Sequence, residues 1–189
     1  MKQSVDQAKQ TNQVNGKQQG RQAPLRQWIT LGVYLALTLA LGFVESQLPP
    51  PPVPFPLRYG LSNIVSMHLL LNQRTKGAYI ITVTKSIFRF FISGPLAGLL
   101  SLSGGLAALT LSYLILKVSK DKASYLAISI PAAVMHNLVQ LAFVGLFIKQ
   151  IGVKVLLIPL ILFGILSGAL TGIILYLAEP VLEKLERHE

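Results

Sequence analysis

The sequence ESQLPPPPVPFPLRYGLSN, residues 45–63, separates two strongly apolar segments and contains six prolines between Pro49 and Pro56. Proline fixes φ and has no N–H to donate, so this density of proline excludes a helix and predicts a stiff, extended segment. Such a segment can hold Val53 and Phe55 as a cover over a site at one membrane face, although a stiff surface connector would have the same composition. After it, Ser62 or Asn63 is expected to cap a new helix.

The composition of the whole chain is that of an integral membrane protein. Of its 189 residues, 52% are hydrophobic and 13% are charged, and the mean hydropathy is +0.57. Cysteine is absent and the three histidines are scattered, so we expect no metal site and no cofactor. The net charge of +10 comes from basic residues that flank apolar segments. This placement is typical of residues that orient a protein in a bilayer, and it argues against a nucleic-acid partner.

Six apolar segments predict an all-α integral membrane protein, a bundle of about six transmembrane helices. Their approximate ranges are 26–47, 60–73, 76–93, 95–117, 124–148 and 153–178. Most of them are long enough to cross about 30 Å of hydrocarbon, but the second is short, so the second and third could instead form a re-entrant hairpin. We expect residues 1–24 to be a disordered polar segment, 25–180 to be the six-helix membrane domain, and 181–189 to be a cytoplasmic charged tail.

Basic residues predict the orientation, because cytoplasmic loops carry an excess of Lys and Arg. Twelve fall on one side of a six-span arrangement: Lys2, Lys9, Lys17, Arg21, Arg26, Arg74, Lys76, Lys117, Lys120, Lys122, Lys184 and Arg187. Three fall on the other side: Arg58, Lys149 and Lys154. Both termini are therefore expected in the cytoplasm and the proline-rich loop outside.

Two basic residues, Lys85 and Arg89, fall inside the third segment, where each costs about 2.5 to 3.5 kcal/mol if it faces lipid. With Ala78 and Thr82 they share one helix face, which must point inward. We take Glu45 to be the only acid within the membrane. One alternative is a structural Glu45–Arg89 pair, and the other is a pocket with surplus positive charge that binds a small molecule with an anionic group.

Further polar residues extend this candidate site. His136 and Gln140 share a face of the fifth segment beside Asn137 and after Pro131, which can kink the helix, although interhelical hydrogen bonding alone would also explain them. His68 and Asn63 are weaker candidates on the second helix. The predicted substrate-binding residues are Glu45, Arg58, Asn63, Lys85, Arg89, His136, Asn137 and Gln140.

Small residues recur every four positions in two segments and are frequent in a third. Such ridges of small side chains let helices approach closely. They are Gly32, Ala36 and Ala40; Gly164, Gly168 and Gly172; and Gly98, Ser101, Gly104, Gly105 and Ala108. Packing within the chain is the default interpretation for all three sets. For the first set, Gly32, Ala36 and Ala40, a surface that docks a partner membrane protein is the alternative.

The motifs LGFVES, LRYGLSNIV, SLSGGL and AVMHNLVQL, together with the proline-rich loop, lie within residues 28–178. In these motifs the chain resembles the Gx transporter family, often labelled heptaprenyl diphosphate synthase component I, which is related to the substrate-binding S subunits of energy-coupling factor (ECF) transporters. The resemblance implies a six-helix bundle in a bacterial cell membrane with a site near the outer face, capped by the loop. It also implies a membrane T subunit and cytoplasmic ATPases as partners, and Ala36 and Ala40 match the A-x-x-x-A docking motif of S subunits.

The chain lacks the motifs that catalysis would need. It has no G-x-x-x-x-G-K-[ST] sequence for ATP hydrolysis, and its only aspartates, Asp6 and Asp121, cannot supply the clustered aspartates of a prenyl synthase. We therefore expect a non-enzyme. One hypothesis is a substrate-binding membrane subunit of a small-molecule, vitamin-type importer, and the alternative is a non-catalytic membrane component associated with a polyprenyl (heptaprenyl) diphosphate synthase.

Overall fold

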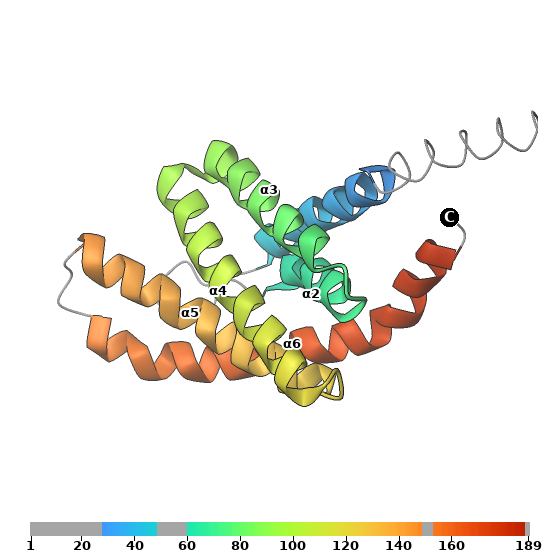
Figure 1. Ribbon diagram of the computed structural model, residues 1–189. Coiled ribbons are helices and arrows are strands. Elements are labelled where there is room, and N and C mark those ends of the chain that lie inside the picture. The colour runs from blue at the N-terminus through green and yellow to red at the C-terminus, as the bar shows by residue number, and fades with distance from the viewer. Residues whose placement is uncertain (1–27, 49–59, 149–152, 188–189) are drawn as a thin grey trace, which may run out of the picture.

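The computed structural model describes residues 28–48, 60–148 and 153–187, and within these ranges every regular element is helical (Figure 1). The elements are a first helix (Trp28–Gln47), a 3-10 turn η1 (Leu61–Asn63), and helices α2 (Ile64–Leu71), α3 (Thr75–Ser93), α4 (Pro95–Ser119), α5 (Tyr125–Ile148) and α6 (Val153–Arg187). The first helix, α4, α5 and α6 are long and apolar enough to cross a membrane. The predicted class, an all-α multi-pass membrane protein, is confirmed.

Helix α2 is the centre of the bundle. It has only 8 residues, so at about 1.5 Å per residue it is far shorter than a bilayer, yet every residue from Ile64 to Leu70 is buried. A turn at Asn72–Arg74 connects it to α3, which packs beside it. The largest apolar core forms around α2, where Leu69 is buried together with Tyr34, Ile81 and Leu175 of the first helix, α3 and α6.

Helix α6 is longer than the sequence predicts, since it continues to Arg187 instead of ending near residue 178. Figure 1 shows it lying along α5 and then continuing beside α2. The glycines of its ridge face α5: a Cβ on Gly168 would lie 2.7 Å from the Cα of Ile130, and one on Gly164 would lie 3.0 Å from the Cα of Val134. Internal packing is therefore confirmed for this ridge.

The first helix has two different faces. Tyr34 and Thr38 are buried against the bundle, whereas Gly32, Ala36 and Ala40 are exposed, and no neighbouring atom lies within 4 Å of where a Cβ on Gly32 would be. The default interpretation of internal packing is wrong for this set of small residues. Its spacing places it on the face opposite the buried one, which periodicity alone could not orient.

Candidate functional site

A cavity between the helices brings the predicted polar residues together. It encloses about 770 Å³ of empty space, counted with its opening. Seven of the eight predicted substrate-binding residues line it: Glu45, Asn63, Lys85, Arg89, His136, Asn137 and Gln140. The eighth, Arg58, lies outside the described residues, as do Val53 and Phe55 of the predicted cover.

The polar face of α3 points into this cavity, as its spacing predicts. Ala78, Thr82 and Lys85 are all buried, and Arg89 lines the cavity one turn further along. The Nζ atom of Lys85 donates a hydrogen bond of 2.6 Å to Oδ1 of Asn63. This bond holds the ammonium group at the junction of η1 and α2, with only 8% of the lysine exposed.

Glu45 has a different role from the predicted ion pair. Its Oε1 accepts a hydrogen bond of 2.8 Å from the N–H of Gly60, and its Oε2 accepts one of 3.5 Å from the N–H of Ser62. These donors stand at the start of η1, where N–H groups lack helical partners. A Glu45–Arg89 ion pair does not form among the described residues, so that alternative is wrong.

The prediction that Ser62 or Asn63 caps the second helix is confirmed for the position of Asn63 but not for a side-chain hydrogen bond. Asn63 occupies the N-cap position of α2, but its side chain makes no capping hydrogen bond. Its Oδ1 is instead turned toward Lys85, while the carboxylate of Glu45, from the first helix, accepts from the nearby backbone. A carboxylate from the first helix thus caps the 3-10 turn η1 that leads into α2.

The polar residues of α5 both join helices and line the cavity. Asn137 donates to the carbonyl of Leu160 at 3.2 Å, and Gln140 donates to the carbonyl of Leu100 at 3.2 Å. Interhelical bonding therefore accounts for part of their role. The amide nitrogen of Gln140 also lies 2.9 Å from Nε2 of His136, and because an amide NH₂ only donates, Nδ1 of the neutral imidazole carries the proton.

That Nδ1 atom is buried and has no hydrogen-bond partner among the described residues. Oγ of Ser129, a residue only 2% exposed, also has no hydrogen-bond partner among the described residues. Both His136 and Ser129 line the cavity. A buried polar atom without a partner costs about 1 to 3 kcal/mol, so such atoms are rare unless a ligand or water meets them. At this cavity they leave two polar groups with hydrogen-bonding capacity that the described protein atoms do not use.

Two glycines of the SLSGGL motif make room for the site. A Cβ on Gly104 would lie 3.0 Å from Cε1 of His136, and a Cβ on Gly105 would lie 2.9 Å from Cγ2 of Thr82. Larger residues here would push α4 away from α5 and α3. The small residues of α4 therefore let the polar side chains of both neighbouring helices reach the cavity.

Sequence reasoning missed a set of hydroxyl groups that completes the lining. They come from helices far apart in the chain: Ser62, Ser66, Ser101, Ser129, Ser167 and Thr171. Their signal was present, because a buried hydroxyl in an apolar span needs a partner. Single Ser and Thr residues are common in membrane helices, however, and nothing in their spacing shows that they converge.

The charge of the lining is positive. Among the described residues around the cavity, Lys85 and Arg89 are cations and Glu45 is the carboxylate, and both oxygens of Glu45 accept backbone hydrogen bonds. In surroundings of low dielectric this balance favours an anionic guest. The described residues contain no group of three or more His, Cys, Asp or Glu side chains placed to hold a metal ion.

Comparison with known proteins agrees with this architecture. The chain matches the model of a family described as heptaprenyl diphosphate synthase component I over residues 34–177. The chain belongs to that family. It is also similar to a solved structure reported as "Structure and mechanism of the S component of a bacterial ECF transporter", with a TM-score of 0.57 and 22% identity, covering 84% of this chain and 95% of that one. No curated protein matches it. The predicted family is confirmed, and the S-component likeness is confirmed as a likeness of fold.

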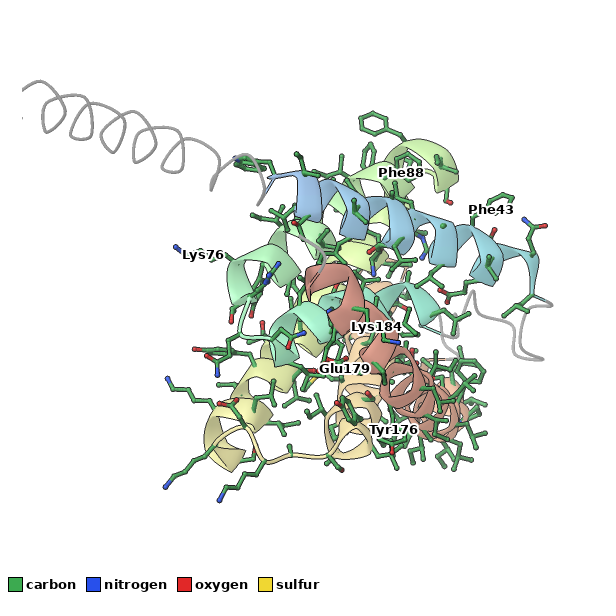
Figure 2. All side chains as sticks on the ribbon, turned by 90° about the vertical axis from the view of Figure 1, so that its right-hand side faces the viewer. Phe43, Lys76, Phe88, Tyr176, Glu179 and Lys184 are labelled. Atoms are coloured by element: carbon green, nitrogen blue, oxygen red, sulfur yellow. The ribbon has the colours of Figure 1, made fainter. Side chains whose placement is uncertain are left out.

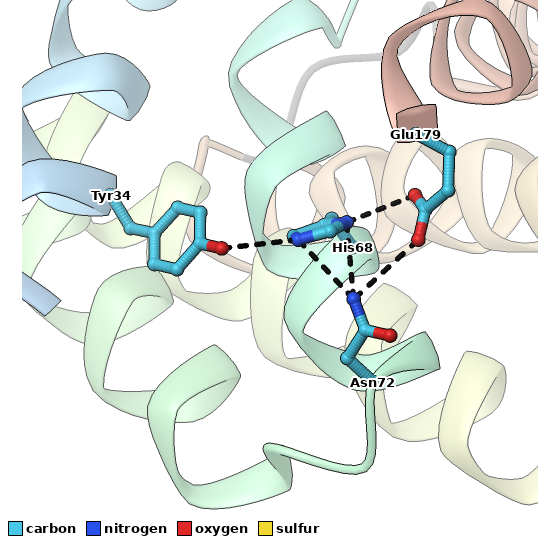
Figure 3. A network of polar contacts seen from close by, with 4 residues as sticks. All are labelled: Tyr34, His68, Asn72 and Glu179. Atoms are coloured by element: carbon cyan, nitrogen blue, oxygen red, sulfur yellow. Dashed lines mark hydrogen bonds and ion pairs between the residues drawn. The ribbon is translucent and has the colours of Figure 1, made fainter. Parts of the chain in front are cut away.

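This member of the heptaprenyl diphosphate synthase component I family contains a second polar cluster, outside the cavity (Figure 3). Tyr34 and Glu179 point toward His68 from opposite sides, with Nε2 of His68 3.1 Å from the hydroxyl of Tyr34 and Nδ1 2.9 Å from Oε2 of Glu179. Because a carboxylate only accepts, Nδ1 of His68 donates to Glu179. Asn72 donates to the other carboxylate oxygen at 3.5 Å.

The second cluster contains a buried acid beyond the predicted sixth segment, so the prediction that Glu45 is the only acid within the membrane stays a prediction. Glu179 lies inside the apolar span Val155–Lys184 and is 7% exposed. The predicted sixth segment ends at residue 178, one residue before Glu179. The cluster links the first helix, α2 and α6, so we regard it as a structural connection.

Proposed function

We propose that this chain is the substrate-binding membrane subunit, similar to an S component, of an importer of small, vitamin-type molecules, and that the cavity binds a small molecule with an anionic group. The observation that carries this proposal is a buried polar cavity, with Lys85 and Arg89 on one wall, inside an otherwise apolar bundle. Charges in such a position are costly and are characteristic of functional sites. The fold, shared with an S component of an ECF transporter, supports the same function.

Each part of the lining has a proposed role in binding. Lys85 and Arg89 attract the anionic group, and the Nδ1–H of His136 and the hydroxyl of Ser129 supply neutral hydrogen bonds. Asn63 positions Lys85, and Glu45 positions the start of η1. Asn137 and Gln140 fix the polar wall of α5, and Arg58 stays a predicted contributor from the loop. None of these roles is catalytic, and we propose no enzymatic activity.

Transport by such a subunit needs an energy source elsewhere, which we propose to be a membrane T subunit and cytoplasmic ATPases. The exposed stripe of Gly32, Ala36 and Ala40 on the first helix is the proposed docking surface. Its small side chains let another helix approach closely, and its face is not used by the rest of the described chain.

We further propose six membrane crossings in a bacterial cell membrane, with both termini in the cytoplasm. The excess of Lys and Arg on one side supports this orientation. Single cysteines introduced at Ser4 and Val53, both outside the described residues, should react with impermeant reagents from opposite sides of intact cells, Val53 from outside. Equal labelling at the two positions would contradict the topology.

The family description favours one alternative function, that of a non-catalytic membrane component of a polyprenyl diphosphate synthase. Purification of the full-length protein from its native membrane distinguishes the two. An importer subunit should retain a small molecule with an anionic group, detected by mass spectrometry, and should co-purify with ATPase and T subunits. Co-purification with a soluble aspartate-rich synthase, without those subunits, would overturn the importer.

A further inference from the structure

A second hollow opens beside the cavity, between the first helix and α3. It contains about 570 Å³ of space, counted with its opening. Most of its exposed wall area is apolar and comes from Leu39, Phe43, Phe88 and Ile92, and Thr38, Ser46 and Ser93 add hydroxyl groups. Phe43 and Ile92 are each 67% exposed, and Phe88 is 46% exposed. Figure 2 shows Phe43 and Phe88 along the same edge of the molecule. We call this hollow the side groove.

The side groove and the polar cavity share three lining residues, Ser62, Lys85 and Arg89. The cations therefore stand at the boundary between a polar compartment inside the bundle and an apolar one at its surface. In a membrane this surface faces acyl chains, because it lies on helices whose exposed side chains are large and apolar. A molecule whose head lies against Lys85 and Arg89 can thus extend a chain into the groove without meeting water.

We propose, building on the anion-binding function above, that the ligand is an amphiphile with an anionic head and a single apolar chain. The head lies at Lys85 and Arg89, and the chain lies in the side groove between the first helix and α3. Each part matches its surroundings, since the charged head is kept from lipid while the apolar chain is kept from the polar cavity. A single-chain lysophospholipid of the membrane and a free alkyl phosphate share this chemistry.

The test measures binding of inorganic phosphate and of n-alkyl phosphates from ethyl to octyl, by calorimetric titration of the full-length protein in phosphatidylcholine nanodiscs. If the chain enters the side groove, the Kd should fall about two- to fourfold for each added methylene, according to how completely the groove buries it. Lys85→Met should weaken binding of all of these probes. Addition of lysophosphatidylglycerol, a lipid with one acyl chain, to the nanodiscs identifies the source, because a site for membrane lipid would then lose octyl phosphate binding.

A matched pair of variants checks where the chain lies. Gly42 lines the side groove but not the cavity. A Cβ on Gly42 would lie 3.7 Å from the Cβ of Ser62, an ordinary van der Waals distance. Gly42→Leu should therefore fit and obstruct the groove. It should remove most of the gain with chain length while phosphate itself still binds. Val44→Leu places the same side chain on the exposed outer side of the same helix and should keep the gain. Thermal unfolding confirms that both variants are folded.

The failures are distinguishable. Equal affinity for phosphate and all esters, with Lys85→Met weakening each of them, would keep the anion site and overturn the groove as a chain site. A gain with chain length that survives Gly42→Leu would overturn it too, because the chain would then lie elsewhere. If inorganic phosphate does not bind, and Lys85→Met does not change the Kd of the alkyl phosphates, the anion site itself is overturned.

Discussion

Replacing Lys85 by methionine separates a binding role from a structural one. Methionine keeps an unbranched apolar chain in the same space but removes the ammonium group. The side chain is 8% exposed and its Nζ donates to Oδ1 of Asn63 at 2.6 Å. We expect Lys85→Met to fold normally and to bind the anionic ligand poorly.

The magnitudes follow from two interactions of the ammonium group, the contact with the ligand and the hydrogen bond to Asn63. A hydrogen bond to a charged group contributes about 1.5 to 3 kcal/mol, so losing the contact with the ligand should raise the Kd about ten- to hundredfold. Losing the bond to Asn63 should change stability by no more than about 1 kcal/mol, because removing a buried charge also removes its desolvation cost. Water in the cavity can then meet Oδ1 of Asn63.

The assay compares ligand retention and thermal unfolding of the same purified samples. Lys76→Met is the matched control, since Lys76 is an exposed lysine in the first turn of the same helix, and it should change neither quantity. A large drop in the yield of folded Lys85→Met protein, with normal affinity in what remains, would refute the reasoning. Lys85 would then be a structural residue.

Three further results are expected. Glu179→Ala removes the carboxylate that accepts from the buried ring of His68, so it should destabilise the fold by about 1 to 3 kcal/mol and lower the unfolding temperature, while ligand affinity is kept. Glu179→Gln should destabilise the fold less. Unfolding temperatures equal to that of the unchanged protein would argue against a structural connection. Gly168→Ala should destabilise strongly because its Cβ would meet the backbone of α5, whereas Gly32→Ala should be neutral or stabilising by about 0.5 to 1 kcal/mol, and the reverse order would contradict the packing. Ala36→Trp should block co-purification of the partner subunits but spare ligand retention, and intact assembly would remove the stripe from the docking surface.

Several features could be predicted because they are local properties of the chain. Hydropathy over about 20 residues marks membrane helices, and a period of 3.6 residues puts Thr82 and Lys85 on one face. The cost of charge in lipid then turns that face inward, and the structure places both residues on the cavity. Helix ends were less predictable, as α6 shows, because the burial of Glu179 depends on a partner in α2.

The sequence by itself determined that this is an all-α membrane protein of a recognisable family with cations inside its bundle. The length of an apolar segment, the helix period and the cost of burying a charge do not depend on how the helices pack against one another. Only the tertiary structure decided which polar groups meet. It joined Glu45 to the backbone of η1, brought Ser129 and Thr171 to one cavity, and left the stripe around Ala36 outside. In lipid, helices are positioned by close packing of small residues and by hydrogen bonds between distant segments. The sequence pattern of a single helix does not show which other segment it will contact in either way.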